Sequence, residues 1–239
     1  MEDTDVQLTR ASRRIRGFTG VLLDVDGTLI DSNDAHTSAW LEALREHGCT
    51  VPFERVRRMI GMGGDKLLPA ARESTWKASS ARRSTRAASA FFWDANLPTL
   101  RPFPCTRALL ERLRGDNFRL VVASSAQSEE LEPLLEQAGV ADLLAARADA
   151  DDADRSKPDP DIVHAALVRT GLAPHQAVLI GDTPYDIAAA MKARVATIAV
   201  RCGGWRADAL QGAIRVYDDP ADLLAQYDFS PMVPQAEPD

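Results

Sequence analysis

Five short apolar runs, separated by helical patterns, constrain the fold of this chain more than any other feature. Each run is almost continuously hydrophobic, which is typical of strands buried on both faces of a parallel sheet. The runs are residues 20–25, 118–124, 177–180, 196–200 and 214–217. Helical patterns at 105–114, 127–138 and 160–170 lie between them, and a glycine follows each pattern. This alternation predicts an α/β fold with right-handed crossovers.

One long stretch breaks the alternation. Between residues 31 and 100 the sequence has helical patterns separated by glycines and a proline, without a strand pattern. The first two runs are therefore about 70 residues apart, far more than an ordinary crossover needs. We expect a discontinuous α/β core of residues 1–30 and 101–239, interrupted by an inserted all-helical cap domain of residues 31–100. The polar segment 1–16 and the proline-rich segment 229–239 are predicted to be flexible tails.

Composition narrows the class of protein. The chain has 239 residues, 45% of them hydrophobic and 26% charged, which is typical of a globular protein. Its formal net charge of −7 argues against nucleic acid as a partner, because binding a polyanion needs a basic surface. Three scattered cysteines, the lack of a signal-peptide pattern and the lack of a long apolar run predict a cytoplasmic protein without a membrane partner. The sequence does not indicate an oligomeric state.

Two aspartates follow the first apolar run directly. Asp24 and Asp26 leave an extended chain on the same side, and Gly27 permits a sharp turn after them. Two carboxylates this close repel each other, and a hard cation relieves the repulsion. Parallel sheets bind their ligands at the carboxyl ends of their strands. The sequence therefore predicts a cation site after the first strand.

Further polar groups are expected at the same edge of the sheet. Ser124 ends the second run, Lys157 begins a later helix, and Asp182 follows the run at 177–180 with Asp186 one helical turn beyond it. A Mg²⁺ ion held by carboxylates, together with a lysine and a hydroxyl, suits phosphoryl transfer. The sequence contains no GxxxxGK[ST] phosphate loop. A carboxylate is therefore the candidate nucleophile.

Four strings of the sequence together resemble a known family. They are DVDGTLIDS at 24–32, VVASSA at 121–126, SKPDPDI at 156–162 and IGDTPYDI at 180–187. In order and spacing they resemble the four motifs of the haloacid dehalogenase-like phosphohydrolases, over about residues 18–226. The helical stretch after the first motif resembles the small cap of the phosphoglycolate phosphatase and β-phosphoglucomutase branch. The resemblance implies a Rossmann-like parallel sheet flanked by helices and a phosphoric monoester hydrolase acting on a small phosphorylated metabolite.

The resemblance also implies a role for each motif residue. Asp24 would be the nucleophile that forms an aspartyl-phosphate, and Asp26 would be the general acid and base. Ser124 and Lys157 would bind the phosphoryl group. The cofactor would be Mg²⁺, bound by the side chains of Asp24 and Asp182 and the backbone carbonyl of Asp26, with Asp186 ligating the ion or ordering its waters.

Three parts of the expected cap are candidates for contact with substrate. His36 lies on one face of a helix predicted at 33–47, where it either faces the substrate or packs under the cap. The segment that contains Gly64 and Lys66 forms either a substrate-contacting loop or a turn between helices. The basic stretch 72–86 either steers phosphate or forms a solvated helix face.

Three alternatives to a phosphatase need to be compared with these motifs. A sugar phosphomutase of the β-phosphoglucomutase type is the first alternative, although Gly181-Asp182 and Thr28 resemble phosphatases more. A non-catalytic binding protein on the same fold is disfavoured because every motif carboxylate is present. A dehalogenase is disfavoured because that branch lacks an aspartate at the position of Asp26. The sequence favours a Mg²⁺-dependent phosphatase.

Overall fold

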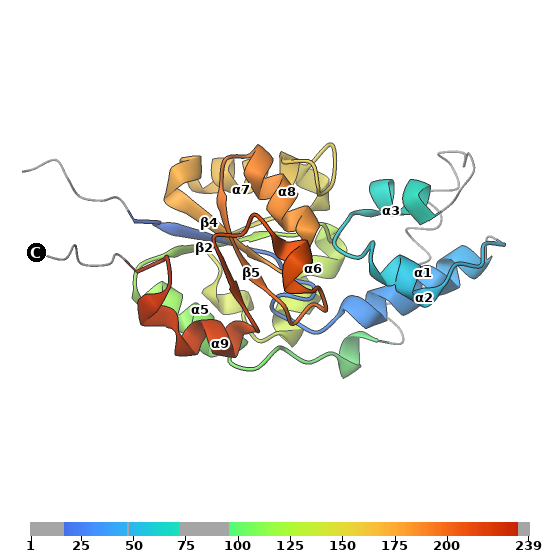
Figure 1. The fold of residues 1–239 in the computed structure, drawn as a ribbon, viewed down its shortest axis with the longest axis horizontal. Coiled ribbons are helices and arrows are strands. Elements are labelled where there is room, and N and C mark those ends of the chain that lie inside the picture. Colours follow the sequence, from blue (N-terminus) through green and yellow to red (C-terminus); the bar gives the residue numbers. More distant parts are fainter. Residues whose placement is uncertain (1–16, 47, 72–95, 234–239) are drawn as a thin grey trace, which may run out of the picture.

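The computed structural model describes residues 17–46, 48–71 and 96–233. Within these residues the strands form a six-stranded sheet in the order β3-β2-β1-β4-β5-β6, and all neighbouring strands are parallel (Figure 1). The strands are β1 Gly20–Leu23, β2 Arg119–Ala123, β3 Ala146–Ala148, β4 Ala177–Gly181, β5 Ala196–Val200 and β6 Arg215–Tyr217. The α/β fold is therefore confirmed, and the strand order is that of the Rossmann fold.

The sheet is buried on both faces, as its apolar runs predict. Successive side chains of a strand point to opposite faces, so Val21 and Leu23 of β1 enter one core cluster and Leu22 enters the other. The strand order reverses around β1, which pairs with β2 on one side and β4 on the other. In open α/β sheets the crevice beyond the strand ends at this switch point is where ligands bind.

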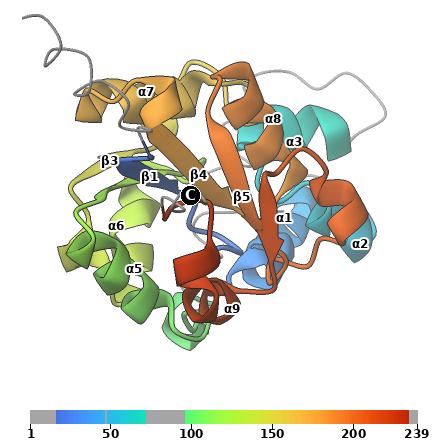
Figure 2. The same ribbon diagram turned by 60° about the vertical axis from the view of Figure 1, so that its left-hand side comes forward.

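Helices cover both faces of the sheet (Figure 2). Those on one face contribute leucines to the cluster that contains Val21; they are α5 Thr106–Gly115, α6 Ser128–Gln137 and α9 Pro220–Ala225. Those on the other face pack on Leu22; they are α7 Asp161–Thr170 and α8 Pro184–Lys192. Short 3₁₀ turns complete the core: η2 Ala141–Leu143, η3 Ala150–Asp152, η4 Pro174–Gln176, η5 Ala207–Leu210 and η6 Tyr227–Phe229.

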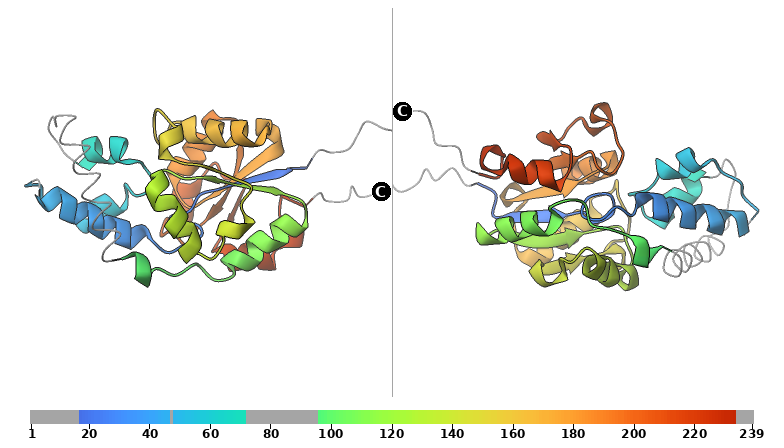
Figure 3. Two further views of the ribbon diagram at one scale, coloured as in Figure 1. Left: turned by 180° about the vertical axis from the view of Figure 1, so that it is seen from behind. Right: turned by 90° about the horizontal axis from the view of Figure 1, so that it is seen from below.

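Between β1 and β2, three helices of the described residues lie together beyond one end of the sheet (Figures 1 and 3). They are α1 Asn33–Glu46, α2 Phe53–Arg57 and α3 Gly64–Ala71, and η1 Leu97–Thr99 leads back toward the core. Leu44, Val56 and Leu67, one from each helix, are fully buried in a cluster separate from those of the sheet. The helices therefore share a small apolar core of their own.

Residues 230–232 differ from the expectation of a flexible tail beginning at residue 229. Ser230 and Met232 are buried, and Met232 belongs to the larger core cluster. An apolar side chain that finds space beside the sheet gains burial whatever the composition around it. Residues 1–16 and 234–239 and the basic stretch 72–86 lie outside the described residues. No helix in the described part of the chain is long and apolar enough to cross a membrane.

Candidate active site

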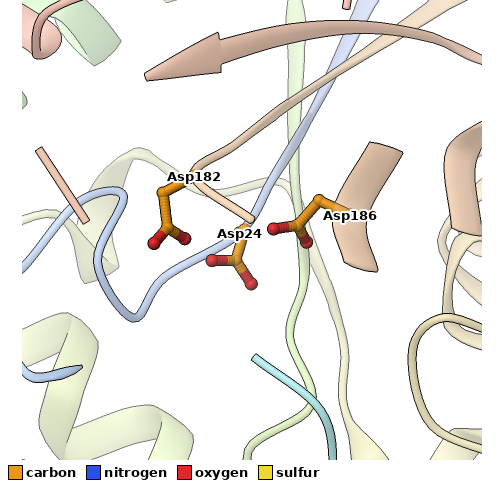
Figure 4. Close-up of side chains that lie close together, drawn as sticks. All are labelled: Asp24, Asp182 and Asp186. Atoms are coloured by element: carbon orange, nitrogen blue, oxygen red, sulfur yellow. The ribbon is translucent and has the colours of Figure 1, made fainter. Parts of the chain in front are cut away.

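Three buried aspartates converge at the carboxyl edge of the sheet (Figure 4). Asp24 follows β1, Asp182 follows β4, and Asp186 lies in the first turn of α8. One oxygen from each carboxylate lies within 4.8 Å of the others, and the three residues are at most 6% exposed. They meet here because β1 and β4 are neighbours in the sheet.

Lys157 supplies a positive charge to this cluster. Its Nζ lies 2.6 Å from Asp24 Oδ1 and 2.7 Å from Asp186 Oδ1, and its side chain is fully buried. Burial opposes the charged form of Lys157, but Asp186 and Asp24 outweigh it and raise the pKa of the ammonium above its ordinary value. One ammonium against three carboxylates leaves the cluster with an excess of negative charge.

The remaining repulsion appears in the pKa values of the carboxyl groups. Burial, with Asp186 adding to it, raises the pKa of Asp24 to about 7. Burial and the Asp24 carboxylate raise the pKa of Asp182 well above its ordinary value. The charged forms of both groups are therefore costly until a cation compensates them.

The donor set fits a hard divalent cation. Carboxylate oxygens are the ligands that Mg²⁺ and Ca²⁺ prefer, and three of them face one another in nearly complete burial. The backbone also makes room around Asp182. A Cβ on Gly203 would lie 1.7 Å from Asp182 Oδ2, and one on Gly27 would lie 2.5 Å from the same oxygen. Any larger residue at position 27 or 203 would therefore displace the Asp182 carboxylate.

The first turn of α8 orients Asp186. Thr183 is the N-cap, and its Oγ1 accepts a hydrogen bond from the Asp186 backbone N at 3.1 Å. Asp186 Oδ2 in turn accepts from the Thr183 backbone N at 3.0 Å. This capping box occupies Oδ2 and leaves Oδ1 beside Lys157. The string IGDTPYDI thus encodes both a helix start and a placed carboxylate.

Ser124 and Asp26 lie beside Asp24. Ser124 follows β2, is 1% exposed, and its Oγ accepts from the Ala126 backbone N at 3.0 Å. Ser32 Oγ donates to Asp26 Oδ1 at 2.5 Å, and His36 Nε2 lies 2.8 Å from the same oxygen. Burial opposes the charge on Asp26, but His36 and Ser32 outweigh it and lower the pKa of this carboxyl group.

His36 lies beside Asp26 and lines the cavity, and its contact with substrate stays a prediction. Burial would lower its pKa, but the Asp26 carboxylate raises the pKa of the imidazole above its ordinary value. His36, Asp24, Asp26 and Ser124 all line one cavity of about 550 Å³. The segment 60–65, which contains Gly64, lines the same cavity.

Lys66 has a different environment from its neighbour Gly64. Its Nζ lies 2.7 Å from Asp159 Oδ2, in the loop that carries Lys157, and Lys66 is not among the residues that line the cavity. Asp65 accepts from Ser156 in the same loop. These contacts join the start of α3 to the core, and contact of Lys66 with substrate stays a prediction.

Two residues at the site lie outside the four sequence motifs. Asn33 Nδ2 donates to Asp182 Oδ2 at 3.1 Å across 149 positions of sequence, and Glu130 of α6 lines the cavity. Asn33 stands just after the first motif, which is the one signal that marks it. Nothing in the sequence marks Glu130, because a glutamate in the first turn of a helix is commonplace.

Comparisons with known proteins identify the family. A family model described as haloacid dehalogenase-like hydrolase matches residues 21–200. A phosphoglycolate phosphatase of Rhodospirillum rubrum is 32% identical over 85% of this chain and 88% of its own length. The probable phosphatase IndB of Dickeya dadantii is 30% identical over 81% of this chain and 85% of its own.

Solved structures agree with these matches. A hydrolase from Pseudomonas syringae superposes with a TM-score of 0.83 at 29% identity, covering 88% of this chain and 98% of its own. A putative β-phosphoglucomutase from Bacteroides vulgatus has a TM-score of 0.80 at 22% identity, covering 89% and 88%, and shares the fold. The expected resemblance, its phosphoglycolate phosphatase and β-phosphoglucomutase branch, and the assignment as a phosphoric monoester hydrolase are confirmed. The chain belongs to the haloacid dehalogenase-like hydrolase family.

Proposed function

We propose that this hydrolase is a Mg²⁺-dependent phosphatase that releases phosphate from a small phosphorylated metabolite through an aspartyl-phosphate on Asp24. The observation that carries the proposal is the convergence of Asp24 with Asp182, Asp186 and the Lys157 ammonium beside a cavity. The names of the relatives, phosphoglycolate phosphatase and probable phosphatase, support the same reaction class.

The side chains of Asp24, Asp182 and Asp186 and the backbone carbonyl of Asp26 are the proposed ligands of Mg²⁺. When bound, the ion neutralises charge on the phosphoryl oxygens and on the carboxylates. Lys157 and Ser124 bind the same phosphoryl group from the other side. Buried donors of this kind stabilise the charge that develops during transfer more strongly than water does.

Two proton transfers are assigned to Asp26. An Asp24 oxygen attacks phosphorus, the bond from phosphorus to the ester oxygen breaks, and Asp26 donates a proton to the departing oxygen. Asp26 then takes a proton from the water that attacks the aspartyl-phosphate, which frees Asp24 and inorganic phosphate. The contacts from Ser32 and His36 favour the carboxylate form, which is the form that the second step requires.

Residues 31–100 are proposed to act as a cap over this reaction. Two observations support this role: α1, α2 and α3 share an apolar cluster apart from the sheet, and segment 60–65 lines the same cavity as Ser124. A cap closed over the phosphoryl group would exclude bulk water until the ester has been cleaved.

The test is phosphate release from an aryl phosphate in the presence of Mg²⁺. Asp24→Asn removes the nucleophilic oxygen and should abolish turnover. Asp31→Asn, an exposed aspartate in the same motif, is the matched control and should retain it. Near-normal turnover by Asp24→Asn would overturn the assignment of the nucleophile.

A further inference from the structure

Among the described residues, the lining of the cavity carries an excess of negative charge. Besides Asp24 and Asp26, four acidic residues line the cavity; they are Asp65, Glu130, Asp151 and Asp154. Within the described residues no lysine or arginine lines it, and His36 is its one basic side chain. A cation bound by Asp24, Asp182 and Asp186 would leave these four carboxylates without a compensating lysine or arginine in the described lining.

Glu130 differs from the other acidic residues of the wall. It is 9% exposed, whereas Asp151 and Asp154 are exposed at the rim. Asp65 accepts from Ser156, and Asp151 accepts from Ser128 at 2.7 Å. Glu130 forms no hydrogen bond or ion pair through its side chain with any described residue. Glu130 is thus a nine-tenths buried residue whose carboxylate lines the cavity without a hydrogen bond or ion pair to a described residue.

The Glu130 side chain does not cap the helix that carries it. Glu130 lies in the first turn of α6, whose N-cap, Gln127, makes no side-chain capping hydrogen bond. The positive end of the helix dipole favours a carboxylate in this turn, so the helix tolerates the charge but does not satisfy the oxygens. Among the described residues His36 responds to this charge: Glu130 raises the pKa of the imidazole, after the larger effect of Asp26.

A ligand that fills the cavity removes water from the Glu130 carboxylate, and this is costly unless the ligand brings a positive donor. A hydroxyl group would satisfy an oxygen of Glu130 but would leave its charge uncompensated. A carboxylate on the ligand would meet repulsion from Glu130 and from the acidic rim. A protonated amine satisfies both the hydrogen bond and the charge.

We propose that Glu130 selects the substrate by pairing with a protonated amine on the alcohol part of the phosphate ester, so that the preferred substrates are amino-bearing phosphate monoesters. This inference rests on the proposed phosphatase activity and names its substrate class. It also separates this chain from the relatives named phosphoglycolate phosphatases, whose substrate carries a carboxylate.

Esters that differ only in one terminal group test the proposal. 2-Aminoethyl phosphate, 2-hydroxyethyl phosphate and phosphoglycolate share one skeleton and end in an amine, a hydroxyl and a carboxylate. Longer aminoalkyl and hydroxyalkyl phosphates extend the first pair until the amine reaches Glu130. At the best length, kcat/KM for the amine should exceed that for the hydroxyl about tenfold or more, as expected for a hydrogen bond between charged groups. Phosphoglycolate should be the poorest substrate.

Variants then assign the preference to one residue. Glu130→Gln keeps the shape and removes the charge, and should bring the amine-to-hydroxyl ratio of kcat/KM close to one. Glu130→Lys should reverse the order in favour of phosphoglycolate. Glu129→Gln makes the same charge change on the exposed neighbour, which does not line the cavity, and should keep the wild-type ratio.

The outcomes separate this inference from the proposed function. If the wild type releases phosphate from all esters with an amine-to-hydroxyl ratio of one or below, the inference is wrong and the phosphatase proposal stands. If Glu130→Gln lowers kcat/KM for every ester by the same factor, Glu130 has a structural role and the inference is also wrong. If no ester and no aryl phosphate is hydrolysed in the presence of Mg²⁺, the proposed function itself fails.

Discussion

The ammonium of Lys157 lies 2.6 Å from Asp24 Oδ1, and both side chains are withdrawn from solvent. The two residues stand 133 positions apart in the sequence, one after β1 and the other in the loop before α7. Their contact joins the proposed nucleophile to the main positive charge of the site. It also makes the stability of the metal-free protein depend on a residue of the site.

Lys157→Met removes this charge and keeps most of the side-chain volume. Two buried carboxylates then lose their counter-charge, so the free energy of unfolding of the metal-free protein should fall by about 3–5 kcal/mol. Urea denaturation with a metal chelator present measures the loss. Lys192→Met, which removes a half-exposed lysine, should change the free energy of unfolding by at most about 0.5 kcal/mol. Equal effects of the two variants would contradict the electrostatic account of Lys157.

Mg²⁺ should stabilise the wild type against unfolding because it binds the folded cluster and not the unfolded chain. At a concentration of about 100 times the Kd the gain is about 2.7 kcal/mol. Asp182→Asn should stabilise the metal-free protein, since it removes a buried charge, and should abolish the gain from Mg²⁺. Thermal denaturation with and without Mg²⁺ measures both effects. Asp208→Asn, at an exposed position, should respond to Mg²⁺ as the wild type does.

Gly203→Ala should impair the cation site through one added methyl group. The new Cβ would lie 1.7 Å from Asp182 Oδ2, so the carboxylate must move away from its place. We expect Mg²⁺ affinity and turnover to fall about 10–100-fold, as when the support of a metal ligand is lost. Gly115→Ala at the end of α5 meets no atom within 4 Å and should leave both unchanged. A Mg²⁺ titration of phosphate release that is identical for the two variants would refute this role of Gly203.

The pair formed by Lys66 and Asp159 should be visible in the titration of Asp159. Hydrogen bonds from Lys66 and Lys192 lower the pKa of Asp159 to about 2. A carboxyl group whose pKa is lowered by folding contributes stability above its ordinary pKa of about 4, and this contribution is lost as the pH falls through about 2. Lys66→Met should raise the midpoint toward the ordinary value in a carboxyl chemical-shift titration by NMR. Lys66→Arg keeps the charge and should keep the midpoint low.

Local sequence features were sufficient to predict much of the fold and the core of the site. Continuous apolar runs predict buried parallel strands because strand burial depends on the residues of the run itself. The aspartates of the first and fourth motifs were expected at one edge for a similar reason: residues that directly follow parallel strands share that edge. The strand boundaries were less accurate, since β1 ends at Leu23 and the chain then turns around Val25.

Other features depend on segments that are distant in sequence. The choice between two environments for His36 depends on its 2.8 Å distance to Asp26. The burial of Met232 depends on space beside the sheet that no local pattern describes. Glu130 becomes informative only because α6 brings it to a cavity whose described lining contains no lysine or arginine.

The sequence by itself determined the α/β class and the chemical groups of the site, because strand burial and the positions after strand ends are set by neighbouring residues. Tertiary structure alone decided which charges are compensated. Lys157 reaches Asp24 and Asp186, Lys66 reaches Asp159, and Glu130 forms no ion pair with a described residue. Electrostatic interaction depends on distance and burial in space, and both are set only when distant segments pack against one another.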